Sequence, residues 1–132
     1  MTFVDTSFWF SLQDRLDRHH QEAAALAGGI RRARLITSNQ VVGETWTTVR
    51  RRLGHAAGVG FLDRLLALPN VEIIHVDEAI EGEAWAWLRR HDERDYSFVD
   101  ASSFAMMRRR RVREALAFDG DFTAAGFVEL RA

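Results

Sequence analysis

Short apolar runs alternate with helix-length segments along most of the chain. Apolar runs bounded by turn residues predict strands at residues 2–5, 35–37, 71–76, 115–118 and 127–130. Between them, apolar residues recur every three or four positions, which predicts helices over residues 6–12, 18–27, 38–53, 59–68 and 77–91. A further helix is expected to begin near Ser97. Strands that alternate with helices indicate an α/β fold, with a short, mostly parallel central sheet covered by helices on both faces.

Glycine and proline mark several of the expected helix ends. Gly28-Gly29 and Gly54 are typical of helix C-termini, and Pro69 breaks the helix that precedes it. In the helix over residues 38–53, Val42, Trp46 and Val49 have the spacing of a buried face. The chain contains no repeat, linker or low-complexity segment, so we expect one domain over residues 1–132.

The helix after Ser97 has almost no polar face, and Asp100 lies in its first turn. A buried carboxylate without a partner is costly, so something must compensate its charge. The pattern Ser97-x-x-Asp100 fits a capping box, in which the carboxylate accepts a hydrogen bond from the backbone of the capping residue. An arginine or a metal ion are the alternatives.

Composition bounds the class of protein. Apolar residues make up 47% of the chain, which is enough for a folded core, and no apolar run is long enough to span a membrane. Met1 leads into an apolar segment without the basic start of a signal peptide, and there is no cysteine for disulfides. We therefore expect a cytoplasmic protein.

The net charge of −1 conceals an uneven distribution, because all 18 basic residues are arginine. They cluster at residues 50–52 and 108–111, where basic patches for nucleic acid are possible. Asp119-x-Asp121-x-Thr123 matches the nucleophile motif of haloacid-dehalogenase-like phosphatases, but that fold needs a downstream lysine. A response-regulator receiver needs one too, so the absence of lysine excludes both.

Four acids follow or adjoin predicted strands. In a parallel sheet, sites form at the carboxyl ends of the strands, so these side chains are expected to converge there. Each alone has a structural explanation as a helix cap, a turn residue or a surface partner of arginine. Together they would repel one another strongly unless a cation held them. The four are Asp5, Glu44, Asp100 and Asp119, with Asp121 beside them.

An all-oxygen ligand set favours Mg²⁺ or Mn²⁺ over zinc. The five histidines show no spacing that pairs them with these acids. A carboxylate-bound divalent ion beside arginine-rich helices points to phosphodiester chemistry, with one acid free to take a proton from water.

Four segments carry a family resemblance: FVDTS around Asp5, NQVVGETW around Glu44, SFVDA around Asp100 and FDGDF around Asp119. In this order and spacing they resemble the acidic motifs of PIN domains, and more narrowly VapC-type toxins of bacterial toxin–antitoxin pairs. The resemblance implies a PIN-like α/β/α sandwich and an Mg²⁺- or Mn²⁺-dependent endoribonuclease. By the same resemblance, Thr6 is the hydroxyl residue after the first acid and Asp121 is an accessory acid.

The resemblance also implies partners. These are a VapB-type antitoxin, a second copy of the chain in a homodimer, and an RNA substrate, with DNA contacted only through the antitoxin complex. Segments 91–107 and 117–127 look most like the branch that cleaves the sarcin–ricin loop of large-subunit ribosomal RNA. Transfer RNA is the alternative substrate.

Other interpretations remain open at the sequence level. Many relatives have Thr or Ser where this chain has Ala117, so a catalytically silent PIN-fold binding module is an alternative, and a DNA nuclease is a third. Arg51, Arg108 and Arg109 are candidate RNA contacts, because phosphate contacts position a nucleic acid. The four tryptophans have a spacing more typical of packing than of base stacking.

Overall fold

The computed structural model describes every residue, Met1–Ala132. Its centre is a five-stranded sheet in the order β3-β2-β1-β4-β5, and every neighbouring pair is parallel. β1 is central, with Phe3 paired to Ile36 on one side and Ala115 on the other. The strands are β1 (Thr2–Val4), β2 (Leu35–Ser38), β3 (Val71–Ile74), β4 (Glu114–Leu116) and β5 (Val128–Glu129).

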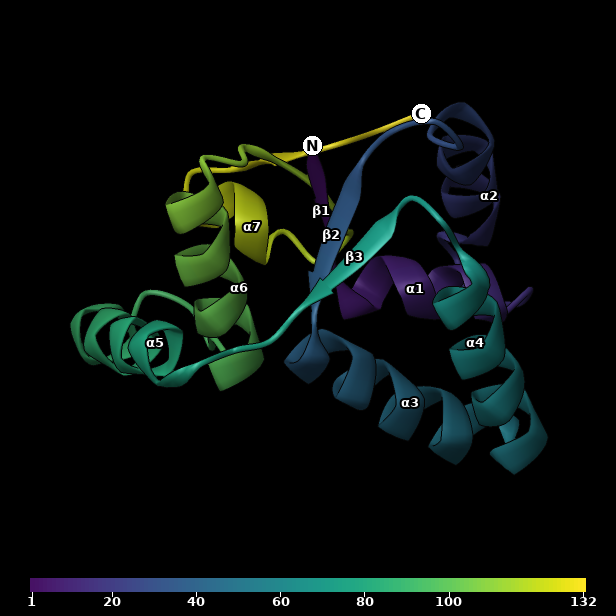
Figure 1. Cartoon of the computed structure of the whole chain (residues 1–132), viewed down its shortest axis with the longest axis horizontal. Coiled ribbons are helices and arrows are strands. Elements are labelled where there is room, and N and C mark those ends of the chain that lie inside the picture. Colours follow the sequence, from purple (N-terminus) through teal and green to yellow (C-terminus); the bar gives the residue numbers. More distant parts are fainter.

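Seven helices cover the sheet in two groups. Figure 1 shows α1 to α4 on one side of the sheet and α5 to α7 on the other, so the expected α/β/α sandwich is confirmed. None of these helices combines the length and apolar character that crossing a membrane demands. They are α1 (Thr6–Gln13), α2 (His20–Gly29), α3 (Asn39–Leu53), α4 (His55–Ala67), α5 (Glu78–Arg90), α6 (Phe98–Arg110) and α7 (Asp121–Ala124).

The core surrounds β1 and α6. Phe3 and Val4 of β1 are fully buried, as is Phe104 of α6, whose ring packs edge-on against Phe122 at 5.0 Å between centroids. Each large apolar side chain buried in this way contributes about 1.5–3 kcal/mol. The first turn of α6 carries Asp100, so the same packing that stabilises the fold also fixes the position of this acid.

The carboxyl ends of the strands are where the chain turns into α1 and α3. Asp5 caps α1, accepting a hydrogen bond from the Ser7 amide, and Ser38 caps α3, accepting one from the Val41 amide. In Figure 1 the tip of β2 points toward the start of α3. These caps fix the direction in which each helix leaves the sheet, and two of the predicted acids, Asp5 and Glu44, lie next to α1 and on α3.

Several predicted boundaries were wrong. β4 was expected over residues 115–118 but ends at Leu116, because the Phe118 amide donates to the Ser7 hydroxyl instead of continuing a strand. The short helix α7 was not foreseen. α4 begins at His55, immediately after Gly54, whose φ of 101° ends α3 without a linker. Gly28 and Gly29 belong to the exposed last turn of α2 and do not follow it.

The buried face of α3 differs from the predicted one. Val49 is fully buried as expected, but the core face continues through Thr45 and Val41, while Val42 and Trp46 are only partly buried. The Thr45 hydroxyl donates to the Val41 carbonyl at 2.8 Å, which satisfies it inside the core. A polar residue can therefore occupy a buried position. As a result, the side of α3 that faces the core is shifted by one residue from the side that the apolar pattern predicted.

Candidate metal centre and active site

An open cavity of about 300 Å³ lies at the carboxyl ends of the strands. Its lining brings together the four acids that the sequence indicated, each from a different part of the chain. Asp5 follows β1, Glu44 lies in the second turn of α3, Asp100 in the first turn of α6, and Asp119 after β4. Segments separated by more than a hundred residues, such as those of Asp5 and Asp119, thus converge on one site.

Asp5 lies at the floor of this cavity, with only 3% of its surface exposed. Its Oδ2 accepts hydrogen bonds from the Ser7 amide at 3.2 Å and the Ser7 hydroxyl at 2.8 Å. Burial first, and then the neighbouring charge of Asp119, raise the pKa of Asp5 to about 8 although the two Ser7 contacts lower it. Helix capping and membership of the acidic site are therefore combined in one residue.

The sequence did not single out Ser7. Its hydroxyl donates to Asp5 and also accepts the Phe118 amide at 3.0 Å, so it joins the end of β1 to the loop after β4. Thr6 also lines the cavity, but its hydroxyl donates to the Val41 carbonyl at 3.5 Å. The signal for Ser7 was present, since a serine two residues after an aspartate commonly hydrogen-bonds with it.

Asp100 is 9% exposed and forms the capping box that the sequence predicted. Its Oδ2 accepts the Ser97 amide at 3.0 Å, and its own amide donates to the Ser97 hydroxyl at 3.0 Å. Burial raises the pKa of this carboxyl above its usual range despite these contacts. The cap orients Asp100 but does not neutralise it.

Asp119 is the most exposed of the four acids. Its Oδ1 accepts the Asp121 amide at 3.1 Å, and desolvation raises its pKa to about 6, with the charges of Asp121 and Asp100 adding to the effect. Carboxylate oxygens of Asp100, Asp119 and Asp121 all lie within 4.8 Å of one another. This spacing lets one cation contact several carboxylates.

Asp121 differs from the other acids because it already has a cationic partner. Arg94, in the loop between α5 and α6, donates from Nε to Asp121 Oδ1 at 2.9 Å and from Nη2 to the Asp119 carbonyl at 3.3 Å. Asp121 does not line the cavity. Arg94 was missed in the sequence, because nothing in a single exposed arginine indicates a partner 27 residues away.

The loop that carries Asp119 is held from behind by Glu129 of β5, whose side chain is 2% exposed. Its carboxylate accepts the Gly120 amide at 3.3 Å and the Thr123 amide at 2.9 Å, and pairs with Arg131 at 3.0 Å. Arg131 also donates to the Ala117 carbonyl. Ala117 itself is fully buried.

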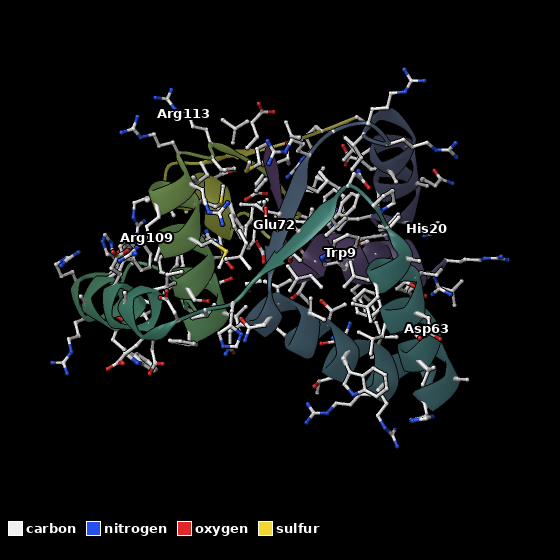
Figure 2. The ribbon with its side chains drawn as sticks, in the orientation of Figure 1. Trp9, His20, Asp63, Glu72, Arg109 and Arg113 are labelled. Carbon is white, nitrogen blue, oxygen red and sulfur yellow. The ribbon has the colours of Figure 1, made fainter.

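The candidate RNA contacts lie in different places. Arg108 and Arg109 are near the end of α6, about 12 Å along its axis from Asp100, and Arg109 pairs with Glu83 at 2.7 Å. Figure 2 shows Arg109 on the α5–α6 side, away from α3. Arg51 does not line the cavity either. The basic residues that do are Arg52, Arg18 and, if protonated, His19.

Comparison with known proteins places these features in context. The PIN domain family profile matches residues 2–128. The 23S rRNA-specific endonuclease VapC20 of Mycobacterium tuberculosis is 52% identical over 132 residues, covering 99% of this chain and 98% of the relative. A crystal structure of that organism's VapC20, described as a sarcin–ricin loop cleaving toxin, superposes with a TM-score of 0.94 at 49% identity over 100% of both chains.

A more distant structure shares the fold alone. VapBC2 from Rickettsia felis, solved with a DNA fragment from its promoter, matches at a TM-score of 0.66 and 13% identity, covering 98% of this chain and 96% of that one.

Proposed function

The chain belongs to the PIN domain family, and on that premise we propose that it is a divalent-metal-dependent endoribonuclease toxin that cleaves the sarcin–ricin loop of 23S ribosomal RNA. The choice of substrate is supported by the full-length similarity to VapC20, which is described as having this activity. The chemistry is supported by the acids gathered in the cavity.

One observation carries the proposal. Asp5, Asp100 and Asp119 each direct one carboxylate oxygen to a backbone amide, and the other oxygen has no hydrogen bond. The bound oxygen fixes the orientation of each side chain, and the remaining one is available to a ligand. The side chain of Glu44, on α3, makes no hydrogen bond within the protein. Oriented free carboxylate oxygens form a set of hard donors, which fits Mg²⁺ or Mn²⁺.

Asp5, Glu44, Asp100 and Asp119 would hold the cation. A bound divalent ion activates water and stabilises charge on the phosphate oxygens. Ser7, Ser97 and the Asp121 amide keep the carboxylates in place. Glu44 is the acid suited to accept a proton at its carboxylate, because neither of its oxygens is committed to the protein. Asp121, paired with Arg94, keeps an accessory role that shapes the Asp119 loop.

We extend the proposal to partners. The chain would bind a VapB-type antitoxin and form a homodimer. Its similarity to a protein described as a toxin supports this part of the proposal. Contact with DNA would then occur only through the antitoxin complex.

The proposal is tested by mapping the 5′ ends of total RNA after brief expression of the wild type, Asp100→Asn and Asp63→Asn. Asparagine can still accept the Ser97 amide, so the capping box survives while the charge is lost. Asp63 lies on α4, far from the cavity, and is the matched control (Figure 2). With the wild type we expect one new 5′ end in the sarcin–ricin loop. Its abundance should be at least about 100-fold lower with Asp100→Asn and unchanged with Asp63→Asn.

Other results separate the alternatives. New ends confined to transfer RNA would identify transfer RNA as the substrate. Cleavage of DNA alone would show that the protein is a DNA nuclease. RNA binding without any cleavage would favour the silent PIN-fold module, for which the buried Ala117 is the supporting observation. Full cleavage by Asp100→Asn would contradict the assignment of the metal site.

A further inference from the structure

The cavity is also lined by basic, hydroxyl-bearing and aromatic side chains. Besides the four predicted acids and Asp17, whose carboxylate accepts hydrogen bonds from Ser11 and His19, its lining includes Phe10 of α1, Arg18 after α1, and Thr48 and Arg52 of α3. The proposed metal chemistry uses none of these residues. An RNA strand approaching four acids is repelled by them, so a nearby cationic surface has a clear physical use.

Helix α3 connects the two regions. Glu44, Thr48 and Arg52 are spaced by four residues and all line the cavity, so they form one stripe along the helix. The rise of a helix places Arg52 about 12 Å from Glu44 along the axis. Arg52 is thus about two turns further along α3 than Glu44 and in the same cavity, a position that suits a phosphate flanking the one held at the acids.

The guanidinium of Arg52 is already positioned. It lies over the ring of Phe10, 5.0 Å from the centroid, and Phe10 is itself 6% exposed. Arg52 forms no salt bridge, whereas Arg94, Arg109 and Arg131 are all paired with acids. A charge held against an aromatic ring and left unpaired keeps its capacity to bind an anion.

We propose that Arg52 is a substrate-positioning residue, which binds an RNA phosphate flanking the scissile one at the outer end of the Glu44–Thr48–Arg52 stripe. The inference rests on the proposed function in taking RNA as the ligand. Such a contact fixes the register of the strand relative to the acids and carries no sequence information. Arg18, which lines the same cavity, supplies a second positive charge.

Arg50 provides a matched control. It lies on the same helix and is also exposed, but it is turned about 200° from Arg52 around the axis and does not line the cavity. Both arginines lie in the last turn of α3, so their replacement has the same effect on net charge and a similar effect on the helix dipole. Any difference between the two variants reports the position of the charge.

The test measures binding of a sarcin–ricin loop RNA hairpin by fluorescence anisotropy, in an Asp100→Asn background with Mg²⁺ and at several salt concentrations. Arg52→Ala should weaken binding about 10-fold and lower the log–log salt slope by about 0.7–0.9, the loss of one phosphate contact. Arg50→Ala should change the Kd less than about twofold. Arg52→Lys should recover part of the affinity, because it keeps the charge but loses the planar guanidinium.

Kinetics of the otherwise unmodified protein supply a second measurement. Arg52→Ala should raise KM about 10-fold and leave kcat within about threefold, since the contact is remote from the reacting phosphate. Equal Kd values and equal salt slopes for Arg52→Ala and Arg50→Ala would overturn the proposal, even if the wild type cleaves RNA. If the wild type cleaves no RNA, the proposed nuclease function fails, and the binding comparison still decides the role of Arg52.

Discussion

Asp5 caps α1 and also lies buried among other acids. These two features of its environment favour opposite protonation states of the carboxyl group. The Ser7 amide and hydroxyl favour the ionised carboxylate, whereas burial and the charge of Asp119 favour the protonated one. Burial prevails and raises the pKa of Asp5 to about 8. Without a cation, the folded protein therefore keeps a proton that the unfolded chain releases near pH 4.

This difference predicts a pH dependence of stability in metal-free protein. Because the folded state retains the proton, the free energy of unfolding falls as pH rises from about 4 to about 8, and then levels off. Asp5→Asn removes this contribution and should stabilise the metal-free protein at pH 8.5 by about 2–5 kcal/mol. Thermal unfolding of both proteins in EDTA between pH 5 and pH 8.5 measures the effect.

The pKa of Asp119 is also raised, to about 6, so this group lowers the free energy of unfolding of both proteins as pH rises from about 4 to about 6. Because this effect is common to both proteins, the difference between their curves reports Asp5 alone and should grow steadily from about pH 4 to about pH 8. Added Mg²⁺ or Mn²⁺ should raise the wild-type midpoint at pH 8.5 more than that of Asp5→Asn. Parallel curves for the two proteins across the whole range would contradict the linkage.

The sequence indicated which acids converge but treated capping and metal binding as competing roles. In the structure the two roles are compatible for Asp5 and Asp100, because one oxygen of each accepts the capping hydrogen bond and the other remains free. Residues that support the acids were harder to find. The contact of Ser7 with Asp5 is local and had a sequence signal. The contacts of Ser7 with Phe118 and of Arg94 with Asp121 join segments far apart in the chain, and no local motif encodes them.

At the scale of elements, β5 is short but holds the loop that carries Asp119. Glu129 accepts hydrogen bonds from two backbone amides of this loop and pairs with Arg131. Arg131 in turn donates to the Ala117 carbonyl. The last strand thus links the C-terminal end of the chain to the acidic cavity. Its contribution to the site comes from hydrogen bonds with the loop, and no side chain of β5 lines the cavity.

Replacing Glu129 with glutamine should destabilise the protein by about 1–3 kcal/mol, because the amide offers one acceptor oxygen in place of two and loses the ion pair. Cleavage should fall at the same time, as the Asp119 loop loses its support. Urea unfolding and RNA cleavage measure the two effects. Glu114→Gln, at an exposed position of β4, is the control, and equal results for both variants would remove the anchoring role.

Elements with strong periodic patterns were predicted well, and short ones were not. The apolar character of α6 and its capping box followed from the sequence, as did the order of strands and helices. α7 spans four residues, too few for a periodic signal. The core face of α3 was misplaced because a hydroxyl that is satisfied by its own helix can be buried as readily as a valine.

At the scale of the molecule, a near-neutral net charge divides into distinct regions. Acids gather inside the cavity, Arg52 and Arg18 lie at its outer wall, and several other arginines are paired on the surface. This arrangement accommodates a cation at the centre and a polyanion around it. The sequence predicted the acidic centre, but its candidate RNA contacts, Arg51, Arg108 and Arg109, do not line the cavity, because residue type alone does not show which side chains share one.

The central claim is that the acids of the cavity form one divalent-cation site. Isothermal titration calorimetry with Mn²⁺ at pH 7.5 tests this claim. The proteins compared are the wild type, Asp100→Asn, Asp119→Asn and the control Asp63→Asn. Saturable binding should appear in the wild type and in Asp63→Asn, and should weaken at least about 10-fold in the other two variants. The same affinity in all four proteins, or no saturable binding in the wild type, would contradict the claim.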